Sequence, residues 1–109
     1  MDFRALAQRI LGAAGFEVAE ASNVPECLAH LRSQATDLVI LDLIMPDRDG
    51  IEALADIKAS FPKIRIVAVS GAGCSELYLR ISSYLGADAS LEKTRIASLC
   101  ALLNVVLDR

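Results

Sequence analysis

Two short apolar runs constrain the fold more than any other feature of this chain. Leu38–Leu41 contains only apolar residues, and Ile64–Val69 is interrupted by a single arginine. Continuous runs of this length are typical of strands in a parallel sheet that is covered on both faces. The chain is therefore expected to fold around a buried parallel sheet.

Helical and strand periodicities alternate along the rest of the chain, with no linker or low-complexity segment. Strands joined by crossover helices are parallel, and the crossovers are right-handed. This order predicts a doubly wound α/β domain of four strands and five helices that begins on a helix. The expected helices span residues 3–14, 25–33, 51–61, 77–85 and 96–107, and the expected strands span 16–21, 38–41, 64–69 and 87–91.

Length and composition exclude several classes of protein. The 109 residues allow one domain, 1–109, and a hydrophobic content of 54% argues against a disordered tail. No apolar run reaches membrane-spanning length and no signal peptide opens the chain. A formal net charge of −3 argues against a nucleic-acid binder. Cys27, Cys74 and Cys100 lack metal-type spacing, so a reduced, cytoplasmic protein is the simplest interpretation.

Three polar residues follow three successive predicted strands: Asp42, Ser70 and Lys93. Parallel strands bring their carboxyl ends to one edge of the sheet, where open α/β sheets bind ligands. A carboxylate, a hydroxyl and an ammonium group in one crevice suit phosphoryl chemistry. Asp42 would accept the phosphoryl group, while Lys93 and Ser70 would bind its oxygens. Each residue alone has an ordinary interpretation as a turn, strand-end or solvated residue, and the combination favours function.

The neighbouring polar residues are assigned to local structure. Asp47 and Asp49 are expected to serve the turn and the N-terminus of the next helix, and Gly50 to allow a tight strand-to-helix entry. His30, the single histidine, is expected on a helix surface.

With these features the sequence resembles the receiver domain of two-component response regulators. The resemblance covers essentially the whole chain and implies a CheY-like, flavodoxin-like fold. It implies that Asp42 is phosphorylated by a histidine kinase or phosphotransfer protein, with Ser70 and Lys93 as the phosphoryl-binding switch residues. It also implies Mg²⁺, with Asp42 and the backbone carbonyl of Ile44 as ligands. The matching residues are 37–46 with Asp49-Gly50, Val69-Ser70-Gly71, Gly86-Ala87-Asp88 and Leu91-Glu92-Lys93.

Three departures from the family pattern stand out. Receivers usually open with a strand that ends in an acidic pair, whereas this chain opens at about the first helix, and Asp2 lies past that position. Because Mg²⁺ prefers several oxygen ligands, including carboxylates, weak or absent metal binding is expected. Ser90 replaces the usual aromatic residue three positions before the lysine. Thr94 replaces the usual proline after it, which would leave Lys93 less rigidly placed.

The absent first strand leaves three structural outcomes open. In the family's sheet order, 2-1-3-4-5, that strand lies inside the sheet. The flanking strands, 16–21 and 38–41, then either pair directly, borrow a strand from another chain, or form an unstable fragment. Because an open apolar edge recruits other strands, self-association through this region is the favoured expectation.

Two alternatives to a phosphoacceptor receiver remain. One is a degenerate receiver that acts as a phosphorylation-independent interaction or dimerisation module, as the absent acids and Ser90 suggest. The other is a small flavodoxin-like enzyme or nucleotide binder that uses 70–73 as a phosphate loop, although no Walker or dinucleotide pattern accompanies that segment. A signalling module rather than an enzyme is the favoured interpretation.

Overall fold

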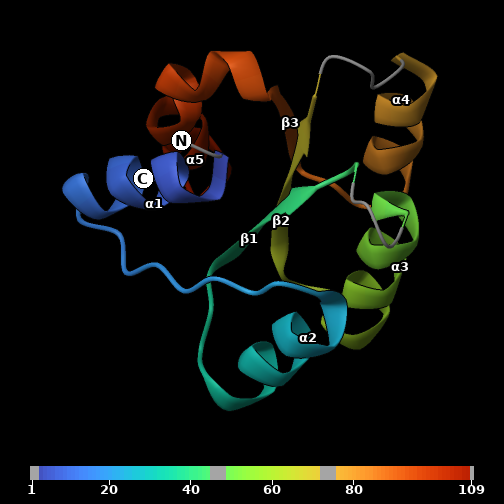
Figure 1. Ribbon diagram of the computed structural model, residues 1–109. Helices are drawn as coiled ribbons and strands as arrows, with labels where there is room; N and C mark the ends of the chain where they lie inside the picture. Colours follow the sequence, from blue (N-terminus) through green and yellow to red (C-terminus); the bar gives the residue numbers. More distant parts are fainter. Residues whose placement is uncertain (1–2, 45–48, 72–75, 109) are drawn as a thin grey trace.

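The computed structural model describes residues 3–44, 49–71 and 76–108. Its centre is a parallel sheet of three strands in the order β1-β2-β3 (Figure 1). The strands are β1 (Leu38–Asp42), β2 (Arg65–Ser70) and β3 (Ala89–Glu92). The helices are α1 (Phe3–Ala13), α2 (Val24–Ser33), α3 (Gly50–Ser60), α4 (Glu76–Tyr84), a 3₁₀ segment η1 (Lys93–Ser98) and α5 (Leu99–Val106).

Helices cover the sheet on both faces, as the apolar runs predict. Alternate side chains of β2 point to opposite faces, so that Ile66 and Val67, both fully buried, belong to different core clusters. Ile66 packs with α2 and α3, whose buried members include Leu54. Val67 packs with α1 and α5, whose buried members include Leu99. The α/β class, the parallel sheet and the five α-helices are confirmed.

Local signals explain where two of the helices begin. Asn23 caps α2, because its side chain accepts a hydrogen bond of 2.8 Å from the Glu26 amide, and Pro25 occupies the first turn. Asp49 caps α3 in the same way through the Ile51 amide at 2.9 Å. The described part of the chain contains no helix long and apolar enough to cross a membrane.

The predicted strand over 16–21 is wrong, so the described sheet has three strands rather than four. A strand needs a ladder partner, and no backbone hydrogen bond joins residues 17–22 to β1, which pairs only with β2 in the part of the chain that is described. The alternating polarity has another cause. Phe16 and Val18 pack against the core cluster of α1 and α5, so one side of the segment is partly buried without a ladder.

The absence of this ladder excludes the first of the three structural outcomes, direct pairing of the two flanking segments. Direct pairing of segments 16–21 and 38–41 does not occur, and the described segment between α1 and α2 crosses to the opposite face as coil (Figure 1). Two boundaries also differ from prediction. Strand β3 begins at Ala89 rather than Ala87, and α5 begins at Leu99 rather than Ile96 because residues 96–98 belong to the 3₁₀ segment η1.

Candidate functional site

The sheet register brings the predicted site residues to one edge. Asp42 is the last residue of β1 and lies opposite Val69, and Ser70 is the last residue of β2 and lies opposite Glu92. Lys93 follows β3 directly as the first residue of η1. All three therefore lie at the carboxyl ends of adjacent parallel strands, where such sheets form their sites.

Both carboxylate oxygens of Asp42 have partners. The Lys93 ammonium lies 2.6 Å from Oδ2, and the Ile44 amide donates a 3.0 Å hydrogen bond to Oδ1. The side chains of Asp42 and Lys93 are 34% and 35% exposed. An ion pair this open is screened by water and adds little to stability, but its geometry fixes a nucleophilic oxygen beside a positive charge.

Ser70 differs from these two residues because it is buried, with 2% exposure. Its hydroxyl forms no hydrogen bond with any described residue. A hydroxyl at this position can donate a hydrogen bond to a ligand oxygen that reaches it from the carboxyl edge.

Phe3 is a neighbour of the site that the sequence did not single out. Its ring centroid lies 5.8 Å from the Lys93 ammonium, within the range of a cation–π contact. The sequence marked Phe3 only as an apolar position of the first helix. Nothing local in the sequence shows that this helix begins beside the lysine, because that proximity arises from tertiary packing.

The chain returns sharply after Asp42. Ile44 and Asp49 form an isolated antiparallel bridge, and the Gly50 amide donates a 3.0 Å hydrogen bond to the Leu43 carbonyl. A Cβ on residue 50 would lie 2.3 Å from Leu43 Cα and from its carbonyl oxygen, which no side chain tolerates. The predicted roles of Gly50 and Asp49 are confirmed, whereas Asp47 lies outside the described residues.

Tyr78 of α4 joins this loop, and the sequence analysis missed it. Its hydroxyl donates to the Asp49 carboxylate and also lies 3.3 Å from both the Leu43 carbonyl oxygen and the Ile51 amide nitrogen. The hydrogen bond from Tyr78, followed by that from the Ile51 amide, lowers the pKa of Asp49 below its usual value. A tyrosine in a mostly amphipathic helix carries no signal for such a contact.

The described residues do not fit a magnesium ion on their own. No group of three or more His, Cys, Asp or Glu side chains among them is arranged to hold a metal. Asp42 and the Ile44 carbonyl provide two oxygens, fewer than the near-octahedral shell that Mg²⁺ prefers, and Asp42 is already paired with Lys93.

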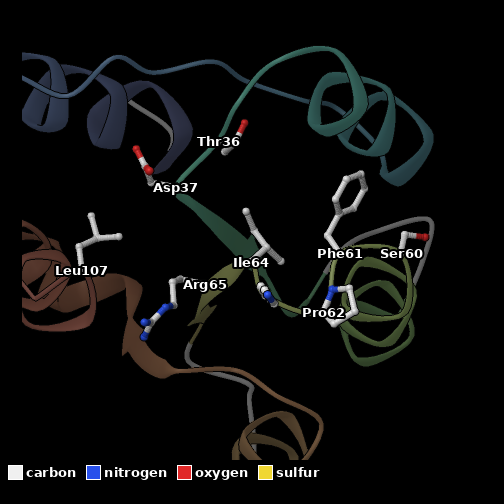
Figure 2. Close-up of a pocket in the computed structure, with 9 residues that line it drawn as sticks. Thr36, Asp37, Ser60, Phe61, Pro62, Ile64, Arg65 and Leu107 are labelled. Atoms are coloured by element: carbon white, nitrogen blue, oxygen red, sulfur yellow. The ribbon is translucent and has the colours of Figure 1, made fainter.

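A separate hollow of about 650 Å³ lies at the opposite end of the strands (Figure 2). Asp37 and Arg65, which border the amino ends of β1 and β2, form part of its wall. Neither Asp42, Ser70 nor Lys93 lines it. It is therefore not part of the carboxyl-edge site.

The remaining site predictions are partly outside the described residues. Residues 72–75, which include Cys74 and half of the predicted phosphate loop, lie there, as do Asp2 and 45–48. Cys27 and Cys100 are free thiols of intermediate burial, and burial raises the pKa of Cys27. Ser90 is exposed on β3.

Comparison with known proteins agrees with this geometry. The family model "Response regulator receiver domain" matches residues 1–104. The chemotaxis protein CheY of Listeria monocytogenes is 38% identical over 74 residues, covering 67% of this chain and 62% of that protein. The response regulator VraR of Staphylococcus epidermidis is 32% identical over 82 residues, covering 74% of this chain and 38% of that protein. The chain thus spans less than two thirds of these curated relatives.

Solved structures show the same fold. The receiver domain of NtrX from Brucella abortus superposes with a TM-score of 0.86 at 26% identity, covering 98% of this chain and 91% of that one. A CheY-like receiver domain protein from Methanospirillum hungatei gives 0.87 at 27% identity, covering 97% and 85%. The strand-end residues, the sheet and these matches agree, and the chain belongs to the response regulator receiver domain family, a signalling module rather than a catalytic enzyme.

Proposed function

We propose that this chain is a phosphoacceptor receiver domain of a two-component phosphorelay, phosphorylated on Asp42 by a histidine kinase or phosphotransfer protein to switch protein interactions. Receiver domains partner with histidine kinases. The observation that carries the proposal is the 2.6 Å contact between the Asp42 carboxylate and the Lys93 ammonium, at the edge where Ser70 also ends its strand.

The chemistry follows from these groups. A carboxylate oxygen of Asp42 attacks the phosphorus of a phosphohistidine, so that a P–O bond forms while the P–N bond breaks and its electron pair returns to the imidazole. Lys93 then shifts from the carboxylate to a phosphoryl oxygen and balances its charge. The buried Ser70 hydroxyl donates a hydrogen bond to another phosphoryl oxygen.

Magnesium is the metal that the family typically binds. The Asp42 carboxylate and the Ile44 carbonyl are the two oxygens that the described residues would contribute to it. Because two protein oxygens are few for this ion, we expect this chain to bind Mg²⁺ more weakly than a receiver with a full acidic set.

A second function is favoured by the open edge of β1. In the described sheet β1 pairs on one side only, and its residues Leu38, Val39 and Ile40 are incompletely buried. An apolar edge with free ladder groups recruits another strand. The chain would then act as a phosphorylation-independent interaction module that self-associates through the β1 edge.

Nuclear magnetic resonance with beryllofluoride, a phosphoryl mimic, and Mg²⁺ separates the two functions. The phosphoacceptor function predicts amide shifts at Ile44 and Ser70 that disappear in Asp42→Asn. If the wild-type amide signals do not shift, the phosphoacceptor function is contradicted and the interaction module is supported.

Self-association has its own measurement. Light scattering over a concentration series should show growth from monomer to dimer. A clean wild-type monomer at high concentration contradicts association through this edge.

A further inference from the structure

Tyr78 faces the loop that follows Asp42 rather than the Asp42–Lys93 pair itself. Its hydroxyl contacts both ends of that loop: Leu43, which directly follows Asp42, and Asp49 and Ile51 at the start of α3. Helix α4 lies beside α3 on one side of the molecule (Figure 1). A single side chain of α4 thus joins three points of the loop.

The hydroxyl has one proton, which the Asp49 carboxylate or the Leu43 carbonyl can accept, whereas the Ile51 amide donates to the hydroxyl oxygen. The ionised Asp49 carboxylate is the strongest acceptor and takes the proton. The Ile51 amide divides its donation between Asp49 Oδ1, at 2.9 Å, and the tyrosine oxygen, at 3.3 Å. The Leu43 carbonyl already accepts from Gly50, so its contact with Tyr78 is secondary. All three contacts exist only while α4 lies against the loop.

The same loop contacts Asp42. The Ile44 amide donates to Asp42 Oδ1, and Ile44 pairs with Asp49 in the antiparallel bridge. A change in the charge of Asp42 alters this amide bond first, and the bridge carries the change to Asp49. Asp49 is the residue that holds the Tyr78 hydroxyl.

We propose that Tyr78 is a positioning residue that couples the loop after Asp42 to α4. The state of Asp42 then changes the placement of the apolar residues that α4 exposes, Leu77, Ile81 and Tyr84, at 65%, 39% and 90% exposure. Their spacing puts them on one side of the helix. The inference rests on the proposed function, because Asp42 is the group whose state changes. Ser90 lies exposed on β3 and brings no aromatic ring to this route.

The proposal is tested by measuring whether a substitution at Asp42 changes the amide chemical shifts of α4. Asp42→Asn is introduced into the wild type, into Tyr78→Phe and into the matched control Tyr84→Phe, which removes a hydroxyl from the same helix at an exposed position. Amide spectra should show that the change shifts Ile44 in all three proteins. Asp42→Asn should also shift the amide signals of Leu79 and Arg80 in the wild type and in the control. In Y78F these shifts should be about threefold smaller.

Equal shifts of the α4 amides in Y78F and the wild type would overturn the proposal. If Y78F fails to fold, Asp49→Asn replaces it, because asparagine retains the helix cap but weakens the bond from Tyr78, and the same reduction is expected. No phosphoryl donor is involved, so this result stands whether or not Asp42 accepts phosphate. The beryllofluoride experiment decides that question separately.

Discussion

Asp42 and Asp88 each lie beside a lysine, at opposite ends of the parallel strands, but they have different hydrogen-bond partners. At the amino end of β2, Asp88 accepts a 2.8 Å hydrogen bond from the Ile66 amide, and the cationic nitrogens of Lys58 and Arg65 lie 4.0 Å away. At the carboxyl end of β1, Asp42 binds Lys93 at 2.6 Å, and its backbone bond goes to Ile44, two residues further on.

This difference distinguishes a carboxylate that binds the central strand from one that binds its own loop and a lysine. Asp88 satisfies an amide of the central strand, so removing it leaves a polar group of the sheet without a partner. Among the described residues, Asp42 bonds to Ile44 of its own loop and to Lys93, which is partly exposed. The amino edge therefore supports the fold, while the carboxyl edge keeps a carboxylate that can change partners.

The largest expected effect on stability comes from the loop after Asp42, where the backbone leaves no room for a side chain at Gly50. Gly50→Ala places a Cβ 2.3 Å from the Leu43 backbone, so the unfolding free energy should fall by about 3 kcal/mol or more. Gly12→Ala is the control, because no atom lies within 4 Å of the added Cβ and alanine favours helix α1. Urea denaturation measures the unfolding free energy of both variants. Equal values would contradict the close approach of residue 50 to the Leu43 backbone.

The comparison itself is tested by removing each aspartate. Asp88→Ala leaves the Ile66 amide without its partner and should cost roughly 1–3 kcal/mol of unfolding free energy. Asp42→Ala breaks an exposed ion pair and should cost less than about 1 kcal/mol. Equal losses in thermal or urea unfolding would show that the two carboxylates are not distinct in role.

A smaller effect is expected in the pH dependence of the carboxyl-edge loop. The lowered pKa of Asp49 means that its ionised form stabilises the fold above the ordinary carboxyl pKa, about 3.9, and that this stabilisation disappears as the pH falls through the folded value. Tyr78→Phe should raise this pKa toward the ordinary value. Carbon-detected titration of Asp49 measures it, with Tyr84→Phe as the control, and an unchanged pKa would contradict the hydrogen bond.

The smallest effect concerns Phe3 and Lys93. Phe3→Leu keeps an apolar side chain but removes the ring, and its coupling with Lys93→Met in a double-mutant cycle should be about 0.5–1 kcal/mol. A coupling of zero would mean that the ring does not help to hold the lysine.

Particular residues show what could be predicted from the sequence. The common placement of Asp42, Ser70 and Lys93 could be predicted because parallel strands align their ends, so order along the chain was enough. The strand at 16–21 was predicted wrongly because alternating polarity indicates which side chains face the core, not whether the backbone has a neighbouring strand to pair with. Phe3 and Tyr78 were missed because their contacts join helices to loops that are distant in sequence.

The phosphoacceptor role proposed for Asp42 can be tested by incubating the protein with acetyl phosphate and Mg²⁺ and measuring the intact mass after rapid quenching. The wild type should gain the mass of one phosphoryl group, whereas Asp42→Asn should gain none and Asp88→Asn should react like the wild type. An unmodified wild type, or a modified Asp42→Asn variant, would contradict the assignment of Asp42.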